Sequence, residues 1–569
     1  MSDFRMTKAQ IEKYLPEPAL IADPNHSTTP LAVWTDTVVK QTIESNPKLK
    51  SEIDRRRNKE RKRLEQALKR QKEADEFLAA FSPEDLLEQG KGLRRKFYLH
   101  VGPTNSGKTY AALEALKKAE SGVYLGPLRL LALEVFETLN YEEVWCDLLT
   151  GEEYEEIPNA GITASTIELA EFDKLYDIAV IDEAQLIADP YRGAAWTNAI
   201  CLIDAVEVHV CLAPEALELI CGMLERMKTP YEIIEHERLV PLEFTGVFKD
   251  IKNVQPGDAL ITFSRKKVLA IAAALEKKGI KASVIYGALP PASRRSEVHR
   301  FASRETGVVV ATDAIGMGIS LPIKRIIFTE TEKFDGFERR LLSSSEIKQV
   351  AGRAGRFGKY DLGEVLTMDN KSYVKECLEA DTPAIRKLQI AFPKEALEYD
   401  YPLDKLLKQW DELPEDELYQ RTDMHSAEKL LAALGPRAAS FPRPLLYELI
   451  TCPVDERNDE LIQYWIRCCE SIARNEPIPK PQYPESDLMF CELKYQAYDI
   501  YHQIQRRIGI EDDCLNDKER LCNKINKFLV HEKRHYLRRC KSCGVELPIS
   551  AKFNYCEKCY AERRFYRGR

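Results

Sequence analysis

A glycine-rich segment, Gly102–Thr109 (GPTNSGKT), follows a short apolar run over 97–101 and precedes a helical pattern. It matches the phosphate-binding loop, in which glycines let backbone N–H groups close around phosphate oxygens. Lys108 offers a positive charge to the β- and γ-phosphates, and the Thr109 hydroxyl can ligate Mg²⁺. The pattern therefore predicts a strand, a loop and a helix that bind a nucleoside triphosphate through Gly102, Pro103, Thr104, Asn105, Ser106, Gly107, Lys108 and Thr109.

An acidic pair follows a second apolar run, over 178–181. We expect this run to be a buried strand that delivers Asp182 to hold Mg²⁺ and Glu183 to activate the attacking water. A phosphate loop can arise by chance in a long chain, but an acidic pair on a hydrophobic strand argues against that alternative. The two segments together predict an ATPase site with Mg²⁺ as its metal.

The pattern of strands and helices divides the chain into five regions. Two of them alternate short apolar strands with helices, which is typical of a parallel α/β sheet, and two such domains in tandem make a cleft. They are followed by helical stretches broken by prolines. The N-terminal region holds a charged helix over 45–78, for which a solvated face and a nucleic-acid or partner contact are both open. We expect an N-terminal helical region, two α/β domains, an α-helical domain and a small tail at 1–92, 93–240, 241–370, 371–535 and 536–569.

Two arginines, Arg353 and Arg356, lie three positions apart in Gln349–Arg356, a segment that we expect to open or enter a helix. On a helix they would share one face. Brought across the cleft, they would act as arginine fingers that stabilise charge on the transferring phosphoryl group. Structural salt bridges are the alternative, and the position of the pair after the phosphate loop and the acidic box favours the fingers.

Four motifs keep one order along the chain: Gly102–Thr109, Asp182–Gln185, Ala311–Gly318 and Gln349–Arg356. This order resembles a superfamily 2 helicase of the DExH group. More narrowly, the chain resembles the mitochondrial-degradosome RNA helicase family and its bacterial relatives through Gly126–Ala132, Thr150–Glu153, Phe263–Lys266, Tyr286–Pro291 and Lys333–Gly336. The resemblance implies two RecA-like domains, ATP hydrolysis, 3′-to-5′ translocation on a single strand, and unwinding of RNA duplexes, often beside an exoribonuclease.

The resemblance also implies roles for single residues. Gln349, Arg353 and Arg356 would meet the γ-phosphate from the second domain, and Asp313 and Gly316 would contact the nucleotide. The strand-binding motifs grip phosphates without reading bases. Their matching residues are Arg129, Ser165, Thr166, Ser264, Arg265 and Thr312. For each of these side chains a helix cap or a surface contact is the alternative role.

Two positions depart from the family pattern. The segment His209–Glu215 stands where the family usually carries a Gly-Glu after the cysteine, and Ser320 stands where it commonly has Asn. Neither change touches the phosphate chemistry. We therefore expect them to affect unwinding more than hydrolysis.

Two C-x-x-C pairs lie near the C-terminus with twelve residues between them. A redox C-x-x-C is normally single and tied to a β-α-β unit, so this spacing favours a tetrahedral metal site. We predict Zn²⁺ bound by Cys540, Cys543, Cys556 and Cys559. Basic and aromatic residues surround the pairs, which suits RNA binding, and a structural clip or a protein-docking role is the alternative.

Composition limits the partners and the location. The net charge of −8 argues against a generally basic nucleic-acid coat, so local charge matters more. The sequence has no apolar run of the roughly 18 residues that span a bilayer and no apolar signal core over 1–30. The fifteen cysteines are mostly single, which suits buried thiols in a reducing compartment. We expect no membrane contact and prefer a bacterial cytoplasm, with an organelle matrix as the alternative.

These patterns predict an ATP-dependent RNA helicase with RNA as its partner and an exoribonuclease as a second partner implied by the family. One alternative is an ATP-gated RNA-binding clamp that hydrolyses ATP without separating strands. The other is a DNA translocase.

Overall fold

The computed structural model describes the chain in stretches that form two compact units. One unit combines the described residues up to Phe81 with Pro393–Leu413, and the other combines Ser82–Phe392 with Pro414–Arg569 where described. The described residues are 19–21, 31–33, 41, 43–81, 84–151, 153–316, 321–335, 338–414, 416–510, 514–531, 540–545, 547, 555–556 and 558–559.

The smaller unit is built around a long charged helix, α3 (Pro47–Ala80), as the sequence predicts. The helix begins after Asn46, whose side chain accepts a hydrogen bond from the Leu49 backbone at 3.2 Å. Its last turn packs against α13 (Leu403–Glu412) and the η7 turn (Lys394–Glu398), where the Phe81 and Trp410 rings lie 5.7 Å apart. The short strands β1 (Ala19–Ile21) and β2 (Leu31–Val33) pair antiparallel in the same unit.

In the described part of the chain, the first α/β domain holds an eight-stranded sheet in the order β10-β3-β9-β8-β4-β7-β5-β6. Neighbouring strands are parallel except for β5 and β6. The strands are β3 (Lys96–Val101), β4 (Gly122–Gly126), β5 (Cys146–Leu149), β6 (Tyr154–Glu155), β7 (Ile162–Thr166), β8 (Leu175–Ile181), β9 (Asp204–Leu212) and β10 (Tyr231–Glu235). The helices are α4 (Glu84–Lys91), α5 (Lys108–Leu116), α6 (Arg129–Tyr141), α7 (Gly193–Leu202) and α8 (Leu217–Arg226), with short η2 (Ile167–Leu169), η3 (Ala184–Ala188) and η4 (Pro214–Ala216) turns.

The second α/β domain, as far as it is described, holds a six-stranded parallel sheet in the order β11-β18-β15-β12-β14-β13. Its strands are β11 (Leu242–Val247), β12 (Asp258–Ile261), β13 (Ala282–Ile285), β14 (Val308–Ala311), β15 (Arg325–Phe328) and β18 (Gly363–Thr367), and β16 (Glu332–Phe334) pairs with β17 (Arg339–Leu341) beside them. The helices are α9 (Arg265–Lys277), α10 (Pro291–Ala302), α11 (Ser344–Ala351) and α12 (Lys371–Glu379), with η5 (Ile251–Asn253) and η6 (Asp313–Gly316) turns.

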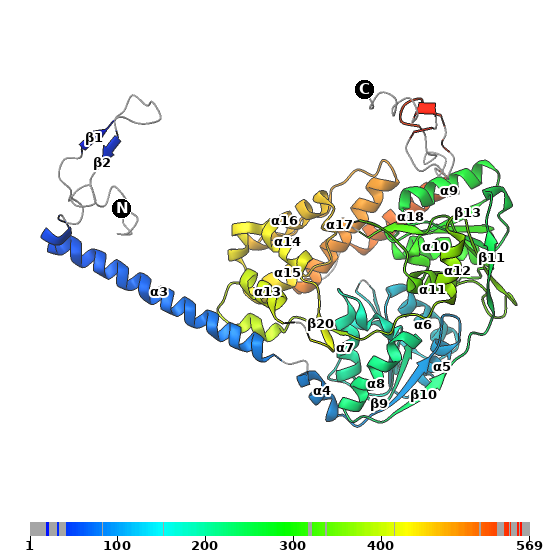
Figure 1. The fold of residues 1–569 in the computed structure, drawn as a ribbon, viewed down its shortest axis with the longest axis horizontal. Helices are drawn as coiled ribbons and strands as arrows, with labels where there is room; N and C mark the ends of the chain where they lie inside the picture. Colours follow the sequence, from blue (N-terminus) through cyan, green and yellow to red (C-terminus); the bar gives the residue numbers. More distant parts are fainter. Residues whose placement is uncertain are drawn as a thin grey trace. The chain divides into compact units, whose positions relative to one another are not determined.

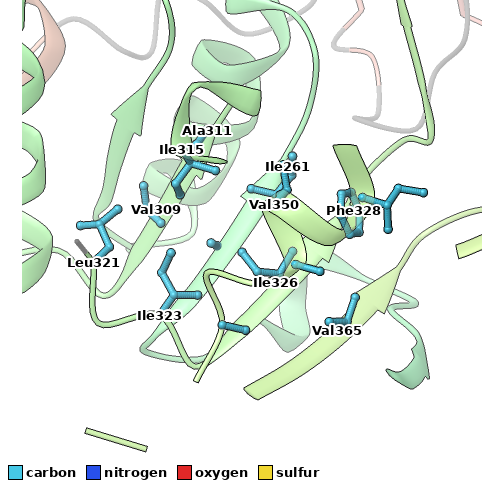
Figure 2. Close-up of a cluster of buried hydrophobic side chains, with 14 of the residues drawn as sticks. Ile261, Val309, Ala311, Ile315, Leu321, Ile323, Ile326, Phe328, Val350 and Val365 are labelled. Atoms are coloured by element: carbon cyan, nitrogen blue, oxygen red, sulfur yellow. The ribbon is translucent and has the colours of Figure 1, made fainter. Parts of the chain in front are cut away.

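Helix α11 is held in place by the core of the second domain. Its Val350 and Ile347 are buried against Ile326 and Phe328 of β15 and Val309 of β14, and Figure 2 shows several of these side chains meeting in one cluster. Central parallel strands are covered on both faces, so they are apolar throughout, and their burial stabilises the domain. The cluster therefore fixes the helix that leads to the two arginines.

The α-helical domain consists of α14 (His425–Leu434), α15 (Arg443–Ile450), α16 (Asp459–Ala473), α17 (Leu488–Arg507) and α18 (Leu515–His531), with an η8 turn (Gly435–Ser440) (Figure 1). The region also holds a short parallel pair that the sequence pattern does not indicate, β19 (Leu388–Ile390) with β20 (Tyr419–Arg421). Within the described residues, no helix combines the length and the apolar character needed to cross a membrane. The predicted architecture of two parallel α/β domains and a helical domain is confirmed.

Helix α17 contacts both α/β domains. Its buried Glu492 lies 2.8 Å from the Arg265 guanidinium and accepts a hydrogen bond from the Tyr286 hydroxyl, both in the second domain. Burial raises the pKa of Glu492 to about 7, and the Arg265 charge opposes that shift. Further along the helix, His502 Nε2 lies 2.6 Å from the Gly151 carbonyl of the first domain.

Candidate nucleotide-hydrolysis site

The phosphate loop runs from β3 into α5, which begins at Lys108. Gly107 has a φ of +82°, a left-handed conformation that a residue without Cβ adopts at little cost. A Cβ on Gly102 would lie 2.4 Å from the His236 carbonyl oxygen, so this position also needs glycine. The Lys108 ammonium donates to the Gly102 carbonyl at 3.1 Å, and the buried Ser106 hydroxyl has no hydrogen-bond partner among the described residues.

The acidic pair lies at the same edge of the sheet as the phosphate loop. Strand register brings Val101 of β3 level with Leu212 of β9, and Ile181 of β8 level with Val210 of the same strand. Both loops therefore leave the carboxyl ends of strands that flank β9, and parallel α/β sheets bind their ligands at this edge.

Asp182 is buried and hydrogen-bonded on both carboxylate oxygens. Oδ1 accepts from the Thr109 hydroxyl at 3.1 Å and from the Glu183 backbone at 2.9 Å, and Oδ2 accepts from the Tyr124 hydroxyl at 2.9 Å. Burial raises the pKa of Asp182, the Glu183 charge raises it further, and Lys108 opposes both. A carboxylate and a hydroxyl at this distance are hard oxygen ligands of the kind Mg²⁺ takes, and a divalent cation would offset the burial of the charge.

Glu183 has a left-handed backbone with φ of +50° and is held by Gln185. The Gln185 amide nitrogen donates to the Glu183 carboxylate, and its Oε1 accepts from the Ala213 backbone at 3.1 Å. Gln185 thus links the acidic pair to Ala213, which lies just after β9 and within the family departure at His209–Glu215.

The second domain contributes two arginines to the same site, though not from one helical face. Helix α11 ends at Ala351, so Arg353 and Arg356 lie in the turn after it, and the expectation of a shared helical face is wrong. The C-cap residue Gly352 keeps helical dihedral angles, and the chain has already left the helix before Gly355, which takes a left-handed φ of +73°. Arg353 donates to the Gly316 carbonyl at 2.6 Å and lies 3.9 Å from the Glu183 carboxylate.

Residues of both α/β domains line one pocket of about 440 Å³. It is lined by Thr104, Asn105, Ser106, Gly107, Lys108, Thr109, Tyr110, Leu113, Tyr124, Leu131, Glu134, Val135, Thr138, Asp182, Glu183, Arg353 and Arg356. The set contains the predicted phosphate loop residues 104–109, the acidic pair and both arginines. Domain closure in the structure therefore places the expected hydrolysis groups around one space.

Glu134 is a pocket residue that the sequence reasoning missed. Burial raises the pKa of this carboxyl, and the nearby Arg356 and Arg353 charges oppose the shift. Leu131, Glu134, Val135 and Thr138 share one face of α6, at the i, i+3, i+4, i+7 spacing. That spacing is the signal in the sequence that could have identified the face.

Five predicted nucleotide contacts do not line the pocket: Gly102, Pro103, Asp313, Gly316 and Gln349. Asp313 lies 3.4 Å from the Lys333 ammonium, and the Gly316 carbonyl accepts from Arg353. The Gln349 side chain packs near Gly316, 3.6 Å from where a Cβ on that glycine would stand.

The predicted strand-binding residues lie after the carboxyl ends of β4, β7, β12 and β14 or at those ends. The Ser264 hydroxyl caps α9 by accepting from the Lys267 backbone at 3.2 Å, and the Thr312 hydroxyl accepts from the Ala314 backbone at 3.3 Å. Ser165 donates to the Thr166 carbonyl at 3.1 Å. Arg265 pairs with Glu492, and Arg129 opens α6. Ser320 lies outside the described residues.

Three histidines form a hydrogen-bonded chain beneath the phosphate loop. His100 of β3 lies 2.9 Å from Nδ1 of His209 in β9 and 3.0 Å from Nε2 of His236, which follows β10. Burial lowers the pKa of His100 to about 4, with a smaller contribution from the two neighbouring imidazoles. The sequence alone does not indicate this chain of histidines, because only the strand order brings the three positions together.

Four cysteine sulfurs gather in the tail. The Sγ atoms of Cys540, Cys543, Cys556 and Cys559 all lie within 4.8 Å of one another, and those of Cys543 and Cys556 are 3.7 Å apart. A tetrahedral Zn²⁺ with Zn–S bonds of about 2.3 Å puts its sulfurs about 3.8 Å apart, so the cluster has the size of such a site. The basic and aromatic residues predicted around it lie largely outside the described residues.

Comparison with known proteins decides the family. Residues 83–236 match the family described as the DEXQ-box helicase domain of Suv3, and residues 243–358 match the helicase conserved C-terminal domain. The chain carries the helicase core of the Suv3 family. The expected resemblance to DExH helicases and to the mitochondrial-degradosome helicase family is confirmed.

Relatives of this Suv3-type core share its sequence over part of their length. The chain is 34% identical over 434 residues to the ATP-dependent RNA helicase SUV3L, mitochondrial, of Oryza sativa subsp. japonica. This alignment covers 72% of this chain and 59% of the relative. It is 37% identical over 332 residues to the ATP-dependent RNA helicase SUV3, mitochondrial, of Saccharomyces cerevisiae, covering 56% of this chain and 45% of that protein. Among solved structures, the Escherichia coli DEAH/RHA helicase HrpB aligns with a TM-score of 0.47 at 16% identity, over 81% of this chain and 64% of that one.

The names of these relatives correct one expectation. Both are named as mitochondrial proteins, as is the Gallus gallus helicase SUPV3L1, which is 33% identical over 454 residues. The preference for a bacterial cytoplasm is therefore wrong.

Proposed function

We propose that the chain is an ATP-dependent RNA helicase that hydrolyses ATP to move along single-stranded RNA in the 3′-to-5′ direction and to separate duplexes. One observation carries the proposal: a single pocket is lined by Lys108, Thr109, Asp182 and Glu183 of one domain and by Arg353 and Arg356 of the other. A site completed only by two domains makes hydrolysis depend on their closure.

In this proposal each domain supplies one part of the chemistry. The phosphate loop binds the β- and γ-phosphates through backbone N–H groups and Lys108, which is now held by loop carbonyls. Glu183, oriented by Gln185, accepts the proton of the attacking water. Arg353, already 3.9 Å from Glu183, turns to the γ-phosphate and stabilises the charge that develops there, together with Arg356.

Mg²⁺ fits the oxygen pair of Thr109 and Asp182. When bound, it would neutralise charge on the β- and γ-phosphate oxygens. The residues that would hold it are already 3.1 Å apart and hydrogen-bonded, so they need little rearrangement. Tyr124 keeps the Asp182 carboxylate in this orientation from the other oxygen.

RNA would lie across the carboxyl ends of both sheets, against the strand-binding segments of β4, β7, β12 and β14. The backbone and the side chains of Arg129, Thr166 and Thr312 are proposed phosphate contacts, which fits binding without base reading. The hydroxyl of Ser264 and the guanidinium of Arg265 are engaged within the protein, so a phosphate would meet the backbone of that segment first.

The segment His209–Glu215, which departs from the family pattern, still contacts the hydrolysis site through Gln185. Gln185 contacts the backbone N–H of Ala213, which any residue there other than proline would supply. We therefore propose that the altered segment retains the coupling of hydrolysis to unwinding.

A helicase assay tests the proposal. Matched RNA and DNA duplexes with 3′ or 5′ single-stranded overhangs should be compared, with Glu183→Gln as the inactive control. The expected result is ATP-dependent strand separation of RNA with a 3′ overhang. ATP turnover without strand separation would favour an RNA clamp, and equal or better separation of DNA would favour a DNA translocase.

We further propose that the four tail cysteines hold one structural Zn²⁺, because their sulfurs are spaced for a tetrahedral ion. The names of the relatives favour a mitochondrial matrix location for the chain. The family resemblance adds a role in RNA decay beside an exoribonuclease, and co-purification of the tagged chain from mitochondria tests both points.

A further inference from the structure

Arg238 lies in the segment that connects the two α/β domains, between β10 and β11. Its guanidinium donates hydrogen bonds to four backbone carbonyls. Two belong to the loop that carries the first arginine finger, Gly352 at 3.0 Å and Ala354 at 2.5 Å. The others are Thr104 of the phosphate loop at 2.9 Å and Val240 of its own segment at 2.7 Å.

Two of these contacts are to the residues immediately before and after Arg353 in the sequence. Arg353 stands between Gly352 and Ala354, so Arg238 holds the two peptide groups that flank it. The Asn105 amide of the phosphate loop donates to the same Gly352 carbonyl at 2.9 Å. A Cβ on Gly352 would stand 2.8 Å from Thr104 Cβ, so the phosphate loop and the finger loop touch directly.

Arginine is the side chain that can make this arrangement. Its guanidinium carries five N–H donors in a fixed plane, whereas lysine offers three donors from one nitrogen. Among the described residues, the hydrogen-bond partners of Arg238 are all carbonyl oxygens. Burial lowers the pKa of this guanidinium to about 10, which leaves it charged at neutral pH.

We propose that Arg238 is a positioning residue for hydrolysis: it fixes the Arg353 loop against the phosphate loop when the domains close, without touching ATP. The inference rests on the proposed ATPase function. Since Arg238 belongs to the connecting segment, its contacts to Thr104, Gly352 and Ala354 form only when that segment, the phosphate loop and the finger loop meet. Hydrolysis therefore depends on the contacts that the connecting segment makes with both loops, as well as on the groups that line the pocket.

The test compares ATP turnover in wild type, Arg238→Met and Arg238→Lys. A misplaced reacting group costs up to about 10²-fold in rate, so kcat should fall by about 10- to 100-fold in both variants. Affinity for a fluorescent ADP should change by less than about threefold, because the phosphate loop itself is retained. Arg226→Met is the matched control, since Arg226 makes an exposed ion pair with Glu84 and should leave turnover unchanged.

A double-mutant cycle shows whether the effect passes through the finger. In an Arg353→Ala background, Arg238→Met should lower kcat by less than about threefold, because the group it positions is gone. Full multiplicative losses in the cycle would overturn the proposal, as would wild-type kcat in Arg238→Met. Arg238→Lys keeps the positive charge and the aliphatic part of the side chain. Its kcat therefore tests the proposal if the methionine variant fails to fold. A wild-type protein without ATP turnover would instead refute the proposed function.

Discussion

Acidification should destabilise the first α/β domain through His100. This imidazole is 3% exposed and hydrogen-bonded to two other imidazoles, and burial holds its pKa at about 4 against an ordinary value of 6.5. Between pH 6.5 and pH 4, His100 therefore stays neutral in the folded domain but is protonated in the unfolded chain. Stability from this group is fully present above pH 6.5 and is lost as the pH falls toward 4.

The size of the effect follows from the interval between the two pKa values. One pKa unit corresponds to about 1.4 kcal/mol, so the loss approaches ~3 kcal/mol once both states are protonated. Between pH 7 and pH 5.5 the unfolding free energy should fall by about 1 kcal/mol from His100 alone. For a domain of this size that lowers Tm by about 2–4 °C.

The assay is thermal unfolding at pH 7 and pH 5.5 at constant ionic strength, for wild type, His100→Gln and the control His425→Gln. His425 is exposed at the start of α14, so its replacement should keep the wild-type pH dependence. Glutamine at position 100 cannot titrate and should reduce the Tm difference between the two pH values. An unchanged difference in His100→Gln would refute the reasoning.

Four other outcomes follow from the site and the tail. Glu183→Gln should lower ATP turnover by about 10²-fold or more while nucleotide still binds, as measured by steady-state hydrolysis and fluorescent nucleotide titration. Arg353→Ala should lower kcat by about 10³-fold, and a fragment ending near residue 240 that matches the whole chain would contradict this. Elemental analysis should find one Zn²⁺ per chain, lost when Cys556 and Cys559 are changed to Ser. Removing residues 536–569 should weaken RNA binding and flatten its salt dependence, whereas equal slopes would remove the tail from RNA binding.

Short apolar runs are enough to predict central strands such as β3 and β8, whereas strands of other composition carry a weaker signal. Strand β7 reads ITAST, so its hydroxyl residues hide a central strand that is buried between β4 and β5. Strand β10 lies at the sheet edge, where its residues are exposed or half-buried and little apolar surface is needed. The spacing of Arg353 and Arg356 suggests a helix through both residues, whereas Gly352 and Gly355 in the same segment argue against one, and α11 ends before them.

The candidate site divides in the same way. The phosphate loop and the acidic pair were recognisable because each is a short local motif whose spacing carries its chemistry. Tyr124, Glu134 and Arg238 were missed because their roles depend on contacts between segments far apart in the chain. Such contacts arise from strand order and domain closure, and neither can be read from one sequence by periodicity.

Helix α17 sets how far the cleft can open while the helical domain stays attached. About 15 Å of stiff helix separates Glu492, paired with Arg265, from His502 at the Gly151 carbonyl. The helix therefore joins the two α/β domains over a fixed length, so a change in the distance between these two contact points has to break one of the two contacts.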